Sequence, residues 1–561
     1  MNKIQNIKLK NALCISLIDE DKIIESLSFF NAYYNELQIL EVDGEQYNEK
    51  HNALSQIFVE YIEKLLYKAD QYIKEEKWSK AILCYEVAYN LDSNVFERID
   101  VLKSFIKCLA QTKQKDLAND MISYFLEITN NDFNNYNWIA EMYYIMEMHK
   151  PAVKYLEDYI NSKNPDEISS EDYNWCGVYY NRLFSEDETR TDYAYKSIEY
   201  FEIAHNINPT NITYLHNITI LCGFVNEFEK SYRAWQKIFK LGKVSDIQKY
   251  DYALLCMKLP KYEDWHKYYY ARYSQDLAEY AFHHFDKPMW DGKTDISDAT
   301  LLLHYEQGFG DNILMYGYVN KLKKLAKHII FVVQEALYPL IKNSDSDIEV
   351  LCCDSIDYQN IDFDYFLPVM SIPQVLNLTP ENISVGSNYI KVRQERVDYY
   401  KKYFNINKLK IGIAFHGNKN FNKYRNIPLK YFKNISELDN VELYILNKDI
   451  HDKELSIFSN NNVHNIAKYF HNFEDTAAAI QNCDIVVSSD NCIMNLAGAL
   501  GKKTLGIFNW YSEWRWFDLT GEDVVWYTSV KPFVNKKMND WENTINEVKE
   551  YIINYYKKNS P

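Results

Sequence analysis

The sequence has no closely spaced cysteine pair of the CxxC kind and no long apolar run. Its ten cysteines are scattered over 561 residues, and the adjacent Cys352 and Cys353 cannot easily bridge each other. This pattern indicates neither a zinc site nor a disulfide framework. No window reaches the roughly 18 uncharged apolar residues that a transmembrane helix requires. We therefore expect reduced thiols, a cytoplasmic protein and no transmembrane segment.

Positive charge is also in short supply. The chain has 62 Lys and Arg residues against 79 Asp and Glu residues, which gives a formal net charge of −17. Because a protein that binds a phosphate backbone needs a basic surface, we expect no nucleic-acid partner. The hydrophobic share of 47% is that of a globular protein, and the length predicts two to four domains.

Glycine is scarce between about residues 51 and 275, where no strand-like alternation occurs either. This part repeats: Ala118 lies 37 residues after Ala81, and Ala152 lies 34 residues after Ala118. Small residues at such a period, with aromatics such as Tyr72 and Tyr85 around them, are typical of tetratricopeptide units. The sequence therefore predicts a helical repeat domain over 51–275, preceded by a helical segment over 1–50.

A solenoid of this kind has a long concave face that can hold a peptide or a protein. Most of its tyrosines are expected to fill the core between helices. The predicted recognition role thus belongs to the architecture, and no single residue is assigned to it.

After Ser274, strand patterns alternate with helix patterns, as in parallel sheets wrapped by helices. The charged helical stretch 393–404 separates four predicted strands from four more. We expect two doubly wound domains, over 276–395 and 396–561, that face each other across a cleft, with a helix at the C-terminal end. Ligands are expected at the carboxyl ends of the strands. The predicted strands span 299–304, 329–333, 348–351, 363–367, 411–415, 442–446, 485–488 and 504–508.

A glycine turn follows the first strand and contains Gln307, Gly308, Gly310 and Asp311. Two glycines let the backbone turn sharply and approach a ligand, while the following helix N-terminus suits a phosphate. The carboxylate of Asp311 adds a group that could take part in a reaction as well as in binding. The alternative is a structural corner that only joins a strand to a helix.

Three further loops place polar or aromatic groups where strands end. The loop after 411–415 contains Asn418 and Arg425, and a loop cation is either a ligand for an anion or simply solvated. The next segment opens a helix with Asp490 and Asn491, one turn before Asn495, and Asp490 alone could be a plain helix cap. The last loop is rich in aromatics, as expected of a loop that covers a ligand or docks a domain.

Five motifs in order are similar to one family, over about residues 55 to 555. They resemble bacterial proteins in which tetratricopeptide repeats precede a heptosyltransferase-like glycosyltransferase domain of the GT-B fold, a group that includes enzymes that glycosylate flagellin. The fold class implied is an α-solenoid followed by a GT-B pair of Rossmann-like α/β domains. The motifs are Trp290-Asp291-Gly292, the stretch His304 to Asp311, Arg425 to Leu429, Asp490 to Lys502, and Trp514-Arg515-Trp516.

The resemblance implies roles for individual residues. Asp311 falls on the general base that deprotonates the acceptor, Arg425 on the basic residue that binds the donor diphosphate, and Asp490 on the acid that contacts the donor sugar. Asn491 stands where Thr or Ser is common, and Asn495 stands where His is usual. Asparagine does not titrate near neutrality, so only hydrogen bonding survives at Asn495.

The function expected is an inverting transfer of a sugar from a nucleotide-sugar donor to a protein hydroxyl, with the acceptor held by the repeats. One base and positive groups at the leaving phosphate suffice for a single displacement, so no metal or other cofactor is expected. Two alternatives stay open: a non-catalytic scaffold with a degenerate transferase domain, and transfer to a lipid-linked saccharide. The expected donor site comprises Asn418, Arg425, Asp490, Asn491, Asn495 and Trp510, and the expected acceptor side comprises Gln307, Gly308 and Gly310 around Asp311.

Overall fold

The computed structural model divides the chain into two compact units, Met1–Pro209 and Thr210–Pro561. It describes residues 3–39, 45–242, 244–259, 261–274, 285–345, 347–379, 381–405, 407–417, 423–450, 452–458, 462–516, 519 and 523–559. The predicted boundary between 275 and 276 therefore lies outside the described residues, as does Asn418. Among the described residues, no helix is both long and apolar enough to cross a membrane.

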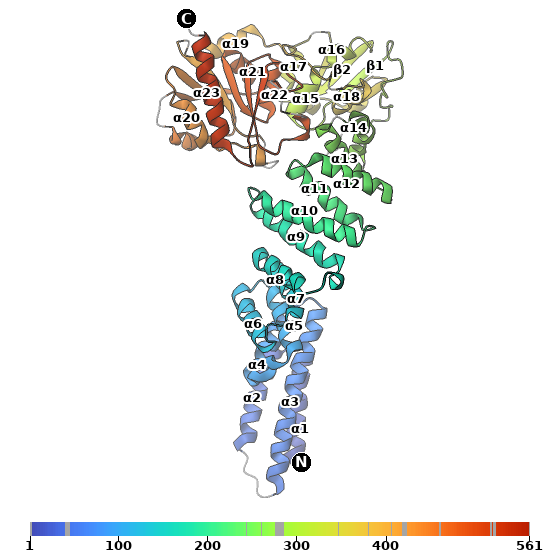
Figure 1. Ribbon diagram of the computed structural model, residues 1–561, viewed down its shortest axis with the longest axis vertical. Coiled ribbons are helices and arrows are strands. Elements are labelled where there is room, and N and C mark those ends of the chain that lie inside the picture. The colour runs from blue at the N-terminus through green and yellow to red at the C-terminus, as the bar shows by residue number, and fades with distance from the viewer. Residues whose placement is uncertain are drawn as a thin grey trace. The chain divides into compact units, whose positions relative to one another are not determined.

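Antiparallel helix pairs make up the first unit (Figure 1). In order, the helices are α1 (Lys3–Asp19), α2 (Ile23–Ile39), α3 (Glu45–Lys74), α4 (Trp78–Leu91), α5 (Ile99–Gln111), α6 (Lys115–Ile128), α7 (Tyr136–Ile145), α8 (His149–Asn161), α9 (Ser170–Glu186) and α10 (Thr191–Ile207). The predicted Ala81, Ala118 and Ala152 occupy one structural position, the fourth residue of the second helix in a pair, and Ser26 and Ala194 occupy it in two further pairs. All are fully buried: Ser26, Ala81, Ala118, Ala152 and Ala194.

The turns inside these pairs also repeat. Two residues before the second helix, the backbone is left-handed at Asp21, Glu76, Lys113 and Glu147, with φ between 56° and 63°. A buried small residue permits the close approach of the two helices, and the turn sets their angle. Because α1 and α2 share both features, the N-terminal helices have the geometry of a repeat, which the sequence pattern alone did not indicate.

The second unit begins with four more helices of this kind: α11 (Ile212–Phe224), α12 (Phe228–Leu241), α13 (Asp246–Lys258) and α14 (Tyr262–Tyr268). Asn226 occupies the left-handed turn position, with φ 58°, and Ser231 the small-residue position. These repeat helices and the two sheets belong to the same compact unit.

The first sheet has four parallel strands in the order β3-β2-β1-β4. They are β1 (Thr300–His304), β2 (His328–Val333), β3 (Glu349–Cys352) and β4 (Tyr365–Pro368). Leu302 of the central strand pairs with Ile330 on one side and Phe366 on the other, and all three are buried. Burial on both faces explains the continuous apolar runs that predicted these strands.

A second parallel sheet has six strands in the order β10-β9-β8-β5-β6-β7. They are β5 (Leu409–Ala414), β6 (Val441–Ile445), β7 (Val463–Asn465), β8 (Ile485–Ser489), β9 (Thr504–Phe508) and β10 (Val530–Val534). The two edge strands were not predicted. β7 has three half-buried residues, and β10 contains Pro532, which lacks the N–H of a central strand and is tolerated at an edge.

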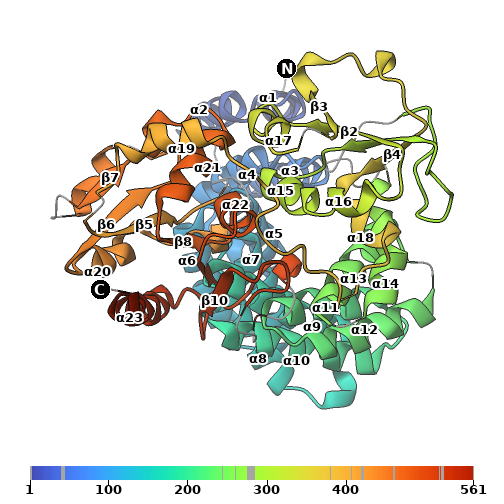
Figure 2. The ribbon, with the colours of Figure 1, turned by 90° about the horizontal axis from the view of Figure 1, so that it is seen from above.

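In each sheet the strand order reverses once, between β1 and β4 and between β5 and β8. Such switch points open a crevice at the carboxyl ends of the strands. Helix α15 (Phe309–Tyr316), which follows β1, packs against α22 (Cys492–Ala499), which follows β8, so the two switch points face each other (Figure 2). The predicted fold class, helical repeats followed by two Rossmann-like α/β domains in the GT-B manner, is confirmed.

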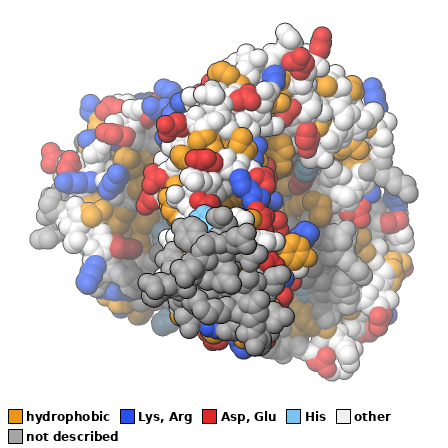
Figure 3. Space-filling model, turned by 90° about the horizontal axis from the view of Figure 1, so that it is seen from below, with side chains coloured by type: hydrophobic (Ala, Val, Ile, Leu, Met, Phe, Trp, Pro, Cys, Tyr) orange, Lys and Arg blue, Asp and Glu red, His pale blue; other side chains and the backbone are white. Residues whose placement is uncertain are grey.

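Charges of both signs are mixed on the surface. On the face in Figure 3, Lys and Arg side chains are interspersed with Asp and Glu among the described residues. The pattern agrees with the acidic balance of the sequence.

Candidate active site

The two switch points enclose a cleft of about 1460 Å³. Helix α13 forms part of its wall with Tyr250 and Leu254, so a repeat helix borders the space between the two α/β domains. Trp510 is not among the lining residues, whereas its neighbour Trp516 is. The cleft is lined by eight of the residues expected in the site, namely Gln307, Gly308, Gly310, Asp311, Arg425, Asp490, Asn491 and Asn495.

The turn after β1 differs in one respect from the sequence expectation. The residue in the left-handed region is Gln307, with φ 61°, while Gly308 is extended and Gly310 lies inside α15. The expectation that the glycines make the sharp turn is therefore wrong. The glycines permit close approach instead: a Cβ on Gly310 would lie 2.8 Å from Nδ2 of Asn495 and 3.3 Å from Cα of Cys492.

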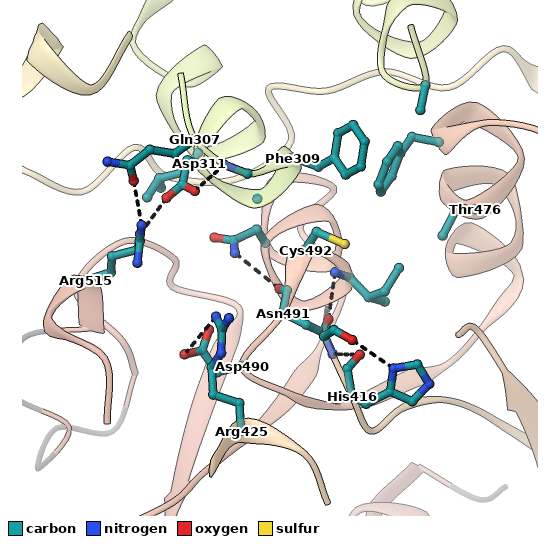
Figure 4. A pocket seen from close by; sticks show the side chains of 18 of the residues that line it. Gln307, Phe309, Asp311, His416, Arg425, Thr476, Asp490, Asn491, Cys492 and Arg515 are labelled. Atoms are coloured by element: carbon teal, nitrogen blue, oxygen red, sulfur yellow. Dashed lines mark hydrogen bonds and ion pairs between the residues drawn. The ribbon is translucent and has the colours of Figure 1, made fainter. Parts of the chain in front are cut away.

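Asp311 is nearly buried and is held from two directions. Its Oδ2 accepts a hydrogen bond from the N–H of Gly308 at 3.0 Å, which closes the first turn of α15. Its Oδ1 accepts from Nε of Arg515 at 2.5 Å (Figure 4). Because Arg515 comes from the domain opposite, this ion pair spans the cleft.

Asn491 and Asn495 use their polar groups within the protein. Oδ1 of Asn491 accepts from the N–H groups of Ile493 and Met494, so Asn491 caps α22. Asn495 donates to the carbonyl of Asn491 at 3.2 Å and accepts from the hydroxyl of Tyr527 at 3.0 Å. A Thr or Ser at 491 would cap the helix in the same way, so the asparagine there preserves the local structure.

Asp490 and Arg425 face each other at the second switch point, with 3.8 Å between Oδ2 and Nη1. Burial raises the pKa of Asp490 to about 6, although Arg425 acts in the opposite direction. Four buried polar atoms at this end of the cleft have no hydrogen-bond partner among the described residues: Nε of Arg425, Oδ2 of Asp490, Nε2 of His416 and Nε1 of Trp516. Buried polar atoms are normally satisfied, so such a group indicates a place where a ligand binds.

Sequence reasoning assigned no role to His416 or Arg515. His416 follows β5 and its carbonyl accepts from Asn447 at 2.8 Å and from Asn491 at 3.3 Å, which joins three strand ends. Arg515 lies in the aromatic loop after β9. The signal that could have found both is their position after a strand on the same sheet edge as Asp490. Among the described residues, no group of three or more His, Cys, Asp or Glu side chains is placed to hold a metal ion.

Comparison with protein families gives no match to any family model. A curated relative is Protein FlbA of Caulobacter vibrioides, which is 24% identical over 310 residues. The alignment covers 49% of this chain and 50% of FlbA, so the chain spans about half the length of the curated relative that it matches.

Several solved structures match parts of the chain. A glycosyl transferase family 9 protein of Veillonella parvula is 11% identical, covers 48% of this chain and 98% of its own, and has a TM-score of 0.35. MamA of Desulfovibrio magneticus is 13% identical, with 32% and 94% covered and a TM-score of 0.27. YrrB, described as a TPR protein with an unusual peptide-binding site, is 16% identical, with 33% and 91% covered and a TM-score of 0.25.

Proposed function

We propose that this chain is an inverting glycosyltransferase that moves a sugar from a nucleotide-sugar donor to a hydroxyl of a protein acceptor. The observation that carries the proposal is the composition of the cleft. One wall offers the carboxylate of Asp311, and the opposite wall offers a partly buried guanidinium, Arg425, beside Asp490. A base facing a cation across a cleft is what a single displacement from a nucleotide diphosphate requires.

The proposed donor end is the second switch point. Arg425 would donate to the diphosphate through Nε, which has no hydrogen-bond partner among the described residues. Nδ1 of His416 lies 3.0 Å from the carbonyl of Gly417 and donates to it, so Nε2 would accept from a hydroxyl of the donor. Asp490 would accept from a hydroxyl of the donor sugar. The pKa of Asp490, raised to about 6 by burial, leaves it mostly ionised near neutrality. The proposed transfer is metal-independent, with Arg425 supplying positive charge beside the leaving phosphate.

The proposed acceptor end is the glycine turn. Asp311 would accept the proton of the acceptor hydroxyl as that oxygen attacks the anomeric carbon, while the bond to the diphosphate breaks and the electron pair leaves with the phosphate. Tyr250 and Leu254 of the repeat helix α13 border this space, which favours an acceptor presented by the repeats, namely a polypeptide. Transfer to a lipid-linked saccharide gains no support from this wall.

Isothermal calorimetry with UDP, GDP, dTDP and ADP tests the donor end. We expect at least one of them to bind the full chain, and Arg425→Ala to weaken binding about 10-fold to 100-fold, because a charge-assisted contact to phosphate contributes about 1.5–3 kcal/mol. Arg425→Lys should retain most of the affinity.

Lys536→Gln is the matched control, since Lys536 is an exposed cation of the same domain with a side chain that is 79% accessible. If the unmodified chain binds none of these nucleotides, the domain is a degenerate scaffold and the proposal fails.

A further inference from the structure

Arg515 holds both ends of the glycine turn at once. Its Nε donates to Oδ1 of Asp311 at 2.5 Å, and its Nη2 donates to Oε1 of Gln307 at 2.6 Å. The third nitrogen, Nη1, donates to Oε2 of Glu513 at 2.7 Å. A guanidinium with five donors in one plane can bind three partners in fixed directions, which an ammonium cannot do.

The residues that Arg515 holds need such support. Gln307 lies at φ 61°, a conformation that costs a residue other than glycine roughly 1 kcal/mol or more. Burial by itself would lower the pKa of Arg515, but the carboxylates of Asp311 and Glu513 raise the pKa above its usual value, so the guanidinium is a permanent cation. Asp311 also acts electrostatically on Tyr269, Tyr527 and Cys492 and raises the pKa of each. Arg515 is the residue of this set that binds Asp311 by a direct ion pair.

The backbone of Arg515 is itself fixed from behind. The indole N–H of Trp526 donates to its carbonyl at 2.6 Å. The loop before it is anchored on the repeat helices: Nζ of Lys258 donates to Oγ of Ser512 at 2.6 Å, and Nδ2 of Asn226 donates to the carbonyl of Trp510 at 2.9 Å. Phe224 also packs on Tyr511, with ring centroids 5.1 Å apart. These contacts bind the aromatic loop, residues 508–516, to the repeat helices beside the cleft.

We infer that Arg515 is a positioning residue for transfer. Its loop is anchored on the repeat helices, and its side chain reaches across the cleft. There it holds the carboxylate of Asp311 in the orientation that receives the acceptor proton. The inference rests on the proposed function. It gives a use to the contacts that the aromatic loop makes with the repeat helices. It also makes the end of the repeat region a part of the catalytic geometry.

A double-mutant cycle tests the inference. Purified variants are added to an extract of the native host that lacks this chain and thus supplies donor and acceptor, and the gain of glycosyl mass on protein is followed by intact-mass spectrometry. We expect Arg515→Gln to slow transfer about 10-fold to 100-fold, since a small misplacement of a catalytic group has effects of this size. Arg515→Lys should restore part of the rate.

The decisive comparison is made in the Asp311→Asn background. If Arg515 acts through Asp311, Arg515→Gln should slow the residual transfer there by less than about twofold, because residues that act as a unit are not additive. The nucleotide affinity and the midpoint of thermal unfolding of each variant separate this effect from a loss of structure. Lys258→Met removes the hydrogen bond to Ser512 that anchors the loop. It should likewise slow transfer when Asp311 is present and have little effect in the Asp311→Asn background.

Equal effects of Arg515→Gln with and without Asp311 would overturn the role of Arg515 while leaving the proposed function intact. No transfer by the unmodified chain, together with no nucleotide binding, would instead remove the proposed function and the role of Arg515 with it. The two failures are therefore distinguishable. Lys536→Gln again serves as the control and should match the unmodified chain throughout.

Discussion

At the scale of single residues, the polar side chains of the site differ in whether their hydrogen-bonding atoms already have partners within the protein. Asn491 and Asn495 form hydrogen bonds with the backbone of α22 and with Tyr527, so both residues stabilise the wall of the cleft. Arg425 and Asp490 form an ion pair with each other, but each keeps one buried polar atom that has no hydrogen-bond partner among the described residues. The replacements of Thr or Ser and of His by asparagine therefore fall on residues with a structural use, and they are weak evidence for a decayed enzyme.

Asp490 gives a pH-dependent test at this scale. Its pKa is raised from 3.8 to about 6 by burial, so between these values the folded chain binds more protons than the unfolded chain. Stability must then fall as the pH rises through this window. Relative to Asp490→Asn, we expect the unmodified chain to lose about 1 kcal/mol between pH 5 and pH 7.5.

Urea unfolding of both proteins at the two pH values measures this difference. Asp439→Asn, at an exposed position of the same domain, is the control. The stability of the unmodified chain minus that of Asp490→Asn should be larger at pH 5 than at pH 7.5. A value that is the same at both pH values, or that is larger at pH 7.5, would contradict the assignment.

At the scale of elements, the contact between α15 and α22 sets the width of the cleft. Gly310 on α15 has no room for a side chain, because a Cβ there would approach Asn495 and the backbone of Cys492. Gly223, near the end of α11, has open space around the same position. Close packing therefore requires a glycine at position 310, whereas the packing at position 223 does not.

These glycines form a matched pair of substitutions. Gly310→Ala should destabilise the chain by about 1–3 kcal/mol and reduce transfer, because it forces α15 away from α22. Gly223→Ala should stabilise the chain by roughly 0.5–1 kcal/mol, since alanine is the better helix former. Thermal unfolding of each variant checks the sign, and a stabilising Gly310→Ala would mean that the two helices are not in close contact.

The sequence predicted the elements better than it predicted their contacts. Apolar runs located the buried strands, and polar residues after strands placed Asp311, Arg425 and Asp490 at one cleft, because carboxyl ends of parallel strands share an edge. The left-handed turn at Gln307 was missed, since neighbouring glycines offered a simpler explanation. The ion pair of Arg515 with Asp311 joins residues 204 positions apart in different domains, and no local pattern encodes such a pair.

At the scale of the second unit, the repeat helices and the first α/β domain share a buried ion pair. Arg272, which follows α14, donates through Nε to Oε1 of Glu306 at 2.7 Å, and both side chains are almost fully buried. Its ring partners Tyr269 and Tyr273 lie within 4.2 Å and 4.1 Å of the guanidinium carbon. Because Glu306 directly precedes Gln307, the repeats contact the glycine turn from behind as well as through Arg515. The last repeat helices belong to the same compact unit as the cleft.

The central claim is that this chain transfers a sugar to protein and that Asp311 is the base. Intact-mass spectrometry of proteins from the native host tests it directly, with the gene deleted and then restored as the unmodified form or as Asp311→Asn. We predict that a glycosyl mass on at least one protein disappears on deletion, returns with the unmodified chain and returns only to a small fraction of that level with Asp311→Asn. An unchanged protein mass on deletion, or full restoration by Asp311→Asn, would contradict the account.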